Sequence, residues 1–493
     1  MTARGVDQEL VVTGVSGLDE LLCGGVLRGA TVLVEGAPGA GKTTLAMGFL
    51  RDGALSHGEP GIMITFEELP RDLHRDARSF GWDLGELEEQ GLLRILCTSP
   101  EALSEDTLSP DGIFERTVAE LQPTRVVIDS INQMAHVCPD PLELRREVYS
   151  LTHCYRRHDL TAILTGEADG VGVGPLPFAE YLADVVIRLD YRLLPEVGER
   201  VREIEVTKSR ARPHHPGRHP FDITGDGLVV TPRLETLAEA PSPVSLEPEL
   251  ISIGSVGLDE MLRGGLVRGS TTIVAGSTGV GKTVLGLQFL LGATACNERG
   301  LFISFEQSPS ELARMARSLG LAHKSLTDNG DLEVVHRLPQ SGRMGQLTAE
   351  IAAIVRERKP HRVVVDAVST LAKTAGEPAR VVIDIGALVS ALHHSGATTL
   401  ICDETPGLVG EFEVTGGVKV SSIADTIIIL RYVELGSEMR RAVSILKARY
   451  CDHDKEIREY VIGQGGLELR DKFQVSTGLL KGAPVQRAIE DFF

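Results

Sequence analysis

The stretch Gly36-Ala37-Pro38-Gly39-Ala40-Gly41-Lys42-Thr43 decides the fold of this chain, because it occurs a second time as Gly276-Ser277-Thr278-Gly279-Val280-Gly281-Lys282-Thr283. Both copies fit the pattern G-x-x-x-x-G-K-[ST]. Each follows an apolar, β-rich run (residues 31–34 and 272–275) and precedes a helical pattern (residues 44–47 and 284–287). This strand–loop–helix context predicts two phosphate-binding loops, and therefore two nucleotide sites.

The residue types in each loop suit phosphate chemistry. Glycines let backbone N–H groups surround phosphate oxygens, and the N-terminus of the following helix adds positive potential. We expect Lys42 and Lys282 to reach the β- and γ-phosphates of ATP, and Thr43 and Thr283 to hold Mg²⁺. The predicted contacts are Gly36, Gly39, Ala40, Gly41, Lys42, Thr43 and Thr44 in the first loop and Gly276, Gly279, Val280, Gly281, Lys282, Thr283 and Val284 in the second.

The composition is that of an ordinary globular protein, and its 493 residues allow roughly two to four domains. No apolar run reaches the ~18–20 residues that span a bilayer, and the first residues lack a secretion signal. We therefore expect a cytoplasmic protein with no membrane partner. The seven cysteines include no C-x-x-C pair and read as reduced thiols. The net charge of −19 makes nucleic acid an unlikely partner, because basic residues that contact phosphates dominate that affinity.

The internal repeat extends well beyond the two loops. Residues 14–22 match residues 254–262, and both segments continue into Gly-Gly-x-x-Arg-Gly. The join between the halves is rich in proline and acid, which is typical of a linker. The sequence therefore predicts an α/β fold class with two tandem P-loop NTPase domains, at residues 8–232 and 248–473, a linker at 233–247 and a tail at 474–493. We expect a mostly parallel central sheet with an edge hairpin in each domain.

An aspartate ends one buried strand in each half. Asp129 closes the run at 125–129, and Asp366 closes the run at 362–366. Ligands of parallel α/β sheets bind at the carboxyl ends of the strands. We therefore predict that both aspartates are Walker-B residues that hold Mg²⁺, partly through water.

Acidic residues also follow the strand-like run at 61–66. Glu67 and Glu68 are candidates for the group that orients or deprotonates the nucleophile. Because adjacent strand side chains point to opposite faces, we expect only one of the two to face the γ-phosphate. The second half has Glu306 and Gln307 at these positions. An amide is no base at neutral pH, so either Glu306 carries the role alone or this site hydrolyses more slowly.

A Lys-x-Arg pair ends a predicted edge strand in each half, as Lys208 and Arg210 and as Lys447 and Arg449. Residues two apart on a strand share a face, so both cations of a pair point the same way. Their recurrence favours a role on the nucleotide of a neighbouring subunit over a solvated hairpin. The histidine-rich stretch 212–219 lacks a carboxylate or cysteine partner at a familiar spacing and reads as a solvated loop.

Together these motifs resemble the KaiC family of RecA-like ATPases, over nearly the whole chain. The resemblance also rests on Ala77-Arg78-Ser79-Phe80-Gly81-Trp82-Asp83-Leu84 and on His453-Asp454-Lys455-Glu456-Ile457-Arg458-Glu459. It implies two RecA-like domains in a double-ring homohexamer, with ATP at the subunit interfaces of both rings. It further implies an ATPase in the first domain and, in the second, an autokinase that phosphorylates adjacent residues across the interface.

Aligned on residues 423–428, the phosphoacceptors of the family fall on Ser421 and Ser422. The resemblance gives Glu306 the role of base, and gives Lys447 and Arg449 that of cations acting in trans. The chain departs from the family pattern in having two serines and in having Gly416 where a threonine is expected. It ends at Phe493 without the long tail that meets KaiA, which makes KaiA binding doubtful; a KaiB-like partner of the first domain is compatible with the resemblance.

Two other functions share much of this pattern. A RecA-type DNA recombinase or helicase has the same fold, although acidity and the full-length repeat argue against it. A nucleotide-gated signalling scaffold without kinase activity is the other alternative, and Gln307 favours it. Retention on single-stranded DNA separates the first alternative from the KaiC-like function, and phosphate incorporation from ATP separates the second.

Overall fold

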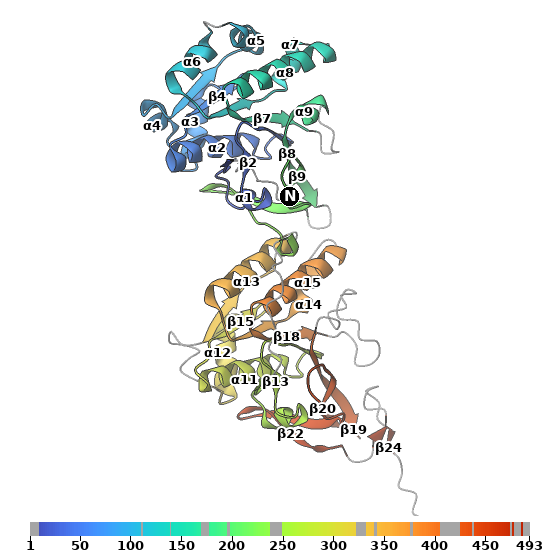
Figure 1. Ribbon diagram of the computed structural model, residues 1–493. Coiled ribbons are helices and arrows are strands. Elements are labelled where there is room, and N and C mark those ends of the chain that lie inside the picture. Colours follow the sequence, from blue (N-terminus) through green and yellow to red (C-terminus); the bar gives the residue numbers. More distant parts are fainter. Residues whose placement is uncertain are drawn as a thin grey trace, which may run out of the picture. The chain divides into compact units, whose positions relative to one another are not determined.

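The computed structural model describes residues 9–109, 112–138, 140–168, 177–194, 198–236, 249–321, 332–339, 343–374, 378–404, 424–435, 438–473, 476–477 and 485–486. The chain divides into two compact units, Met1–Thr236 and Leu237–Phe493 (Figure 1). Each unit contains one nine-stranded sheet.

The first unit alternates strands and helices through its parallel part. Its elements are β1 Leu10–Val11, α1 Leu18–Leu21, β2 Val26–Leu27, β3 Thr31–Gly36, α2 Lys42–His57, β4 Gly61–Thr65, α3 Pro70–Arg78, α4 Leu84–Glu89, β5 Leu93–Cys97, α5 Pro100–Leu108, α6 Ile113–Leu121, β6 Arg125–Asp129, α7 Gln133–Val137, α8 Pro141–Arg157, β7 Thr161–Glu167, α9 Pro177–Leu182, β8 Val185–Leu194, β9 Glu199–Ser209, β10 Arg218–Thr224, β11 Gly227–Val230 and the 3₁₀ turn Leu234–Thr236.

The second unit repeats the order of the strands of this sheet. Its elements are β12 Leu250–Ile251, α10 Val256–Met261, β13 Leu266–Val267, β14 Thr271–Gly276, α11 Lys282–Ala295, β15 Gly300–Ser304, α12 Pro309–Ser318, β16 Leu332–His336, α13 Met344–Arg358, β17 Arg362–Asp366, α14 Val368–Thr374, α15 Pro378–His394, β18 Thr398–Glu404, β19 Thr426–Leu435, β20 Glu438–Ala448, β21 Arg458–Gly463, β22 Gly466–Lys472, β23 Ser476–Thr477 and β24 Val485–Gln486.

The two large sheets have the same topology. The strand order is β11-β10-β9-β8-β3-β7-β6-β4-β5 in the first and β16-β15-β17-β18-β14-β19-β20-β21-β22 in the second. Neighbours from β8 to β5 run parallel, and the β8–β9, β9–β10 and β10–β11 pairs are antiparallel. The predicted α/β class with a mostly parallel sheet is confirmed. The predicted hairpin, β8–β9, is followed by β10 and β11, which lie outside it at the sheet edge.

Helices cover both faces of the first sheet (Figure 1), and the strands are apolar for that reason. Val32 and Val34 of β3 pack into the core beneath α2, whereas Leu33 packs with α6 and α8 on the opposite face. This alternation follows from the two-residue period of a strand. Such a central strand brings its loop to the middle of the carboxyl edge, between two helical layers.

In each unit a buried arginine begins the strand that ends in the aspartate, which is β6 in the first unit and β17 in the second. Arg125 is 1% exposed, donates to the Phe49 carbonyl at 2.7 Å and pairs with Glu59 at 2.6 Å. Arg28 also contacts Glu59, at 2.8 Å, and pairs with Glu9 at 2.9 Å. The first unit thus ties the start of β6 to the end of α2 and to the segment before β3.

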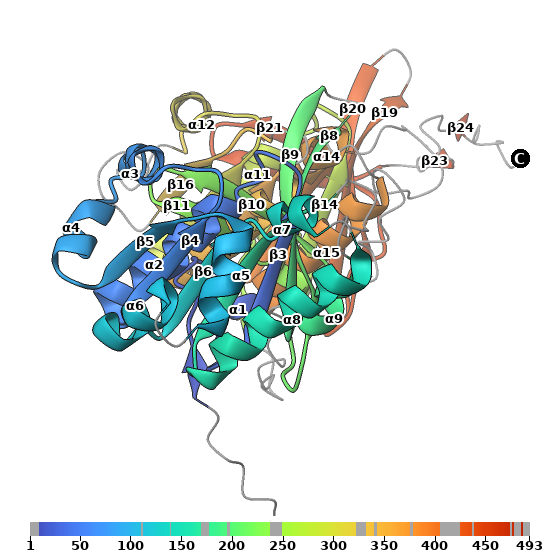
Figure 2. The same cartoon turned by 90° about the horizontal axis from the view of Figure 1, so that it is seen from above.

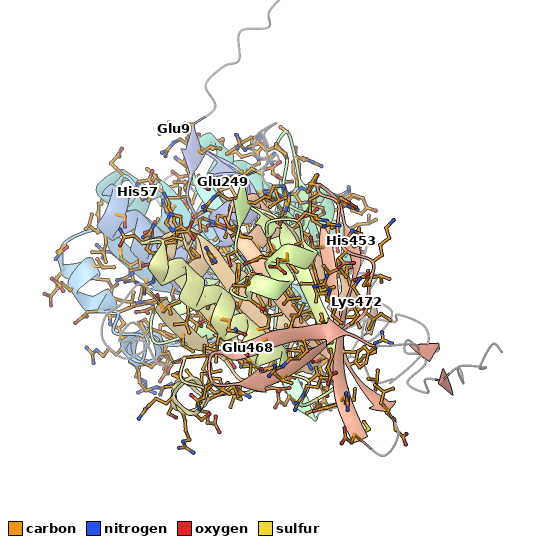
Figure 3. All side chains as sticks on the ribbon, turned by 90° about the horizontal axis from the view of Figure 1, so that it is seen from below. Glu9, His57, Glu249, His453, Glu468 and Lys472 are labelled. Atoms are coloured by element: carbon orange, nitrogen blue, oxygen red, sulfur yellow. The ribbon has the colours of Figure 1, made fainter. Side chains whose placement is uncertain are left out.

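The second unit repeats this ion-pair network. Arg362 pairs with Glu298 at 2.8 Å, and Arg268 pairs with Glu298 at 2.7 Å and with Glu249 at 2.8 Å. Figure 3 labels Glu249 and its counterpart in the first unit, Glu9. Charged groups are expensive to bury unless they are paired, so the recurrence of the network indicates that it belongs to the fold rather than to one site.

Candidate nucleotide sites

Each phosphate loop lies between the central strand and the longest helix on one face, β3 and α2 or β14 and α11. Lys42 Nζ donates to the carbonyls of Gly36 and Ala37 at 2.8 and 3.2 Å. Lys282 Nζ makes the same contacts with Gly276 and Ser277, at 2.8 and 2.9 Å. Burial lowers the pKa of Lys42. In both loops the ammonium therefore lies within the curve of the backbone, where phosphate oxygens can replace the carbonyls as its partners.

Glycine is required at the last turn of each loop. Gly41 and Gly281 have φ of 107° and 104°, a region that L side chains rarely adopt. A Cβ would also lie 2.9 Å from Ile223 at the first position and 2.5 Å from Ile462 at the second. The antiparallel strands β10 and β21 thus pack directly beneath the loops. This packing explains why the sheet extends beyond the predicted hairpin.

The predicted Mg²⁺ groups are in contact in both units. Thr43 Oγ1 donates to Asp129 Oδ2 at 2.7 Å, and Thr283 Oγ1 donates to Asp366 Oδ2 at 2.7 Å. Asp366 is 6% exposed, and burial raises its pKa. A hydroxyl and a carboxylate offer the hard oxygen ligands that Mg²⁺ prefers, with water and phosphate completing its shell. The donor set therefore fits the ion.

The sequence reasoning missed the residues that support each aspartate. Thr165, near the end of β7, donates to Asp129 Oδ1, so both carboxylate oxygens are held. Cys402 occupies the equivalent place on β18, in register with Asp366, and its Sγ lies 3.6 Å from the Lys282 carbonyl. Burial raises the pKa of this thiol. The only sequence feature that could have indicated these contacts is the position of Thr165 and Cys402 on the strands next to the Walker-B strands, β7 and β18.

The acids after β4 and β15 lie in bends rather than on the strands, because the strands end at Thr65 and Ser304. Strand alternation therefore does not set the directions of Glu67 and Glu68, and the expectation that only one of them faces the γ-phosphate stays a prediction. Gln133 Nε2 donates to Glu67 Oε1. Burial, followed by the charge of Asp129, raises the pKa of Glu68. Both carboxylates thus lie on the side of the Walker-B strand, in different surroundings.

The second unit holds its acid in the same way. Thr370 Oγ1 donates to Glu306 Oε1. Gln133 and Thr370 occupy equivalent positions, four residues beyond their Walker-B aspartates. The Gln307 backbone N–H donates to Ser304 Oγ at 2.9 Å, and its Oε1 is buried with no hydrogen-bond partner in the described part of the chain. Gln133 and Thr370 were also missed, since their distance from the glutamates in sequence hides the contact.

The Lys-x-Arg pairs lie at the other edge of the sheet. Lys208 donates to the carbonyls of Glu180 and Ala183 at 2.6 and 2.7 Å, and Arg210 donates to that of Tyr181 at 3.0 Å. Both cations thus lie on the same side, at the C-terminal end of α9, where carbonyls attract cations. The Arg210 backbone is linked through Asp184 to Thr31, the first residue of β3. About 17 Å of strand therefore separates the pair from its own phosphate loop.

The second unit has an equivalent arrangement. Lys447 donates to the Ala424 carbonyl at 2.6 Å, and Arg449 lies 3.7 Å from Asp425. Ser421 and Ser422 fall in 405–423, outside the described residues.

Among the described residues no helix is both long and apolar enough to cross a membrane.

Relatives of known name match almost the entire chain. The circadian clock oscillator protein KaiC of Acaryochloris marina is 32% identical over 494 residues, which cover 99% of this chain and 93% of the relative. KaiC of Thermosynechococcus vestitus is 34% identical (98% and 93% covered), and the circadian clock protein KaiC3 of Synechocystis is 33% identical (97% and 95% covered). The family described as "ATPase: KaiC" matches residues 11–235 and again residues 251–473. The chain belongs to the KaiC family of ATPases.

Proposed function

We propose that this protein binds and hydrolyses Mg·ATP in both domains, and that its second domain phosphorylates Ser421 and Ser422 of a neighbouring subunit. The observation that carries the proposal is a set of three contacts present in both units. In each, the loop lysine lies within the phosphate loop, the loop threonine contacts the Walker-B aspartate, and a glutamate is held by a side chain four residues past that aspartate.

These contacts support a chemical role for each group. Lys42 and Lys282 bind the β- and γ-phosphates, and Mg²⁺ held by the threonine and aspartate neutralises charge on the phosphate oxygens. Glu67, oriented by Gln133, positions and deprotonates the water that attacks the γ-phosphate. Glu306, oriented by Thr370, does the same for the hydroxyl of Ser421 or Ser422. Glu68, whose pKa is raised by burial and by the charge of Asp129, is the second candidate for this role.

The position of the Lys-x-Arg pairs supports an oligomer. Each pair lies at the start of the central strand, whereas its own phosphate loop lies at the end of that strand. Lys208 and Arg210, and Lys447 and Arg449, would therefore act on the nucleotide of an adjacent subunit. We propose a double-ring homohexamer in the cytoplasm, with domains close to 8–232 and 248–473, a linker at 233–247 and a tail at 474–493. A KaiB-like partner of the first ring fits this assembly.

Labelled γ-phosphate tests the kinase assignment. The Ser421→Ala/Ser422→Ala double variant is expected to lose incorporated label while keeping ATP hydrolysis in the first domain. Ser310→Ala, an exposed serine on α12 of the same domain, is the matched control and should label like the wild type. Equal labelling of the double variant and the wild type contradicts the assignment of these serines.

A scaffold function for the second domain is the second candidate, and Gln307 favours it. Its buried Oε1 has no partner among the described residues, where the first domain has the carboxylate of Glu68. In this case the second site binds ATP but turns it over slowly. Incubation with ATP followed by intact-mass measurement separates the two functions, because a scaffold stays unmodified. The Gln307→Glu variant should raise turnover of the second domain in both cases.

A further inference from the structure

A cluster of three metal-ligating side chains lies in the first unit, outside the nucleotide site. Glu115, Cys154 and His158 offer ligand atoms that all lie within 4.8 Å of one another. His158 Nε2 is 3.1 Å from Glu115 Oε1. We propose that these residues form a Zn²⁺ site that links α6 to the C-terminal end of α8, which goes beyond the function proposed above and does not depend on it.

The helices place the three groups together for simple reasons. Cys154 and His158 are four residues apart on α8 and its C-cap, so their side chains point to the same side of the helix. Glu115 is in the first turn of α6, in the same helical layer, which Figure 2 shows from above. Both helices contribute to one apolar cluster, through Phe114 on α6 and Tyr155 on α8. That packing holds the two helices in register next to the ligands.

The ligand set is one that zinc prefers. A thiolate, an imidazole and a carboxylate bind Zn²⁺ at about 2.0–2.3 Å, which puts tetrahedral ligand atoms about 3.4–3.6 Å apart. In the structure the three ligand atoms lie within 4.8 Å of one another, so binding of the ion would bring them closer together. Cys154 is 2% exposed, while the side chains of Glu115 and His158 are 23% and 26% exposed. The site thus has a buried soft ligand and an open side for entry of the ion and for a fourth ligand, water.

The second unit shows that the fold does not need these groups. Counted from the Walker-B aspartate of each unit, Glu115 corresponds to Ala352, Cys154 to Ala391 and His158 to Ser395. Ala352 is a buried residue of α13, which packs against α15. The same helix packing therefore forms with small residues that cannot ligate a metal. A thiol, an imidazole and a carboxylate converge only in the first unit, among the described residues, so helix packing alone does not explain them.

The cluster lies far from the phosphate loop of the first unit. His158 precedes β7 at the start of that strand, whereas Glu167, near the phosphate loop, is at its end. Zn²⁺ is bound by the thiolate, so binding exchanges the thiol proton for Zn²⁺: the S–H bond breaks, an S–Zn bond forms and one proton is released to solvent.

Zinc titration of the full-length protein tests the site. Protein freed of metal by a chelator and dialysed is expected to bind about one Zn²⁺ per chain, with release of a proton. Co²⁺ in place of Zn²⁺ should give a near-ultraviolet band from the thiolate–cobalt bond. Cys154→Ala and His158→Gln should each weaken Zn²⁺ binding more than about 100-fold, since loss of an outer partner of a ligand alone costs about 10–100-fold.

Two controls separate this site from other metal-binding groups. Cys97→Ser removes an exposed cysteine and His214→Gln removes a histidine of the 212–219 stretch, and both variants should bind Zn²⁺ like the wild type. Zn²⁺ should also raise the thermal midpoint of the first domain in the wild type and in these controls. If Cys154→Ala does not fold, the His158→Gln variant, at a partly exposed position, decides. Unchanged zinc affinity in His158→Gln, or no tight binding by the wild type, overturns the proposal.

Discussion

The side chain that orients each glutamate is a property of single residues. Gln133 and Thr370 reach Glu67 and Glu306 from equivalent positions, with an amide in one domain and a hydroxyl in the other. Both donate one hydrogen bond to a carboxylate oxygen. The hydrogen bond fixes the orientation of the carboxylate. Because the donor is neutral, it adds no charge to the site.

Removing the donor should slow ATP hydrolysis without weakening ATP binding. Gln133→Ala is expected to lower kcat of the first domain about 10–100-fold, because a small misplacement of a catalytic group costs up to about 10²-fold, with little change in KM. Steady-state kinetics in a Lys282→Ala background isolates the first domain. Gln133→Thr introduces the hydroxyl donor that Thr370 provides in the second domain. This variant should restore much of kcat. If Gln133→Thr does not restore kcat, Gln133 has a structural role only.

At the scale of elements, the buried arginine networks hold each Walker-B strand in place. Arg125 and Arg362 are almost fully buried and bridge the start of β6 or β17 to the helix that follows the phosphate loop. A buried ion pair adds little net stability, but removing one partner leaves an uncompensated charge. Removing one partner from either network should therefore lower the stability of its sheet.

Arg125→Met is expected to destabilise the first unit by about 1–3 kcal/mol, because the Phe49 carbonyl loses its buried donor and Glu59 loses one of its two arginine partners. Trp82 is the single tryptophan and lies in the core of this unit, so its fluorescence during urea unfolding reports the first unit alone. Arg75→Met, which removes an exposed arginine of α3, should leave the midpoint nearly unchanged. Equal midpoints for the wild type and Arg125→Met would contradict this prediction.

The same network predicts a loss of stability in acid. Burial raises the pKa of Glu59, but hydrogen bonds from Arg28 and Arg125 outweigh it and hold the pKa below the usual 4.5. A folded-state pKa below the unfolded value stabilises the protein above the unfolded pKa, and this stability is lost as pH falls through the folded pKa. The Trp82 unfolding midpoint should therefore fall below about pH 4.5, and Glu59→Gln should flatten that part of the profile. A profile that stays as steep in Glu59→Gln would assign the acid sensitivity to other carboxyl groups.

At the scale of the whole molecule, the Lys-x-Arg pairs and the phosphate loops occupy opposite edges of each sheet. This separation suits the proposed ring, in which the cations of one subunit would act on the nucleotide of the next.

Mixing two inactive variants tests this arrangement. Lys208→Ala/Arg210→Ala and Lys42→Ala should each lose first-domain hydrolysis, measured with the second loop disabled by Lys282→Ala. Mixed and reassembled in equal amounts, they should recover about a quarter of the activity, because about that share of interfaces combines an intact loop with intact cations. No recovery would mean that the cations only cap α9 within their own subunit.

The sequence by itself determined both phosphate loops, both Walker-B strands, the repeat and the α/β class. These are local signals: Gly41 and Gly281 must adopt positive φ, and β3 and β14 are buried on both faces. β5, β10 and β11 were missed, because short or mixed runs carry a weak pattern.

Only the tertiary structure decided which residues meet. Strand order and register bring Thr165 to Asp129, Gln133 to Glu67 and Cys402 to Asp366, and they set the Lys-x-Arg pairs at the far edge of the sheet. Helix packing likewise brings Glu115 to Cys154 and His158. The physical reason is that such contacts depend on how elements distant in sequence pair and pack, which the local periodicity of a chain does not encode.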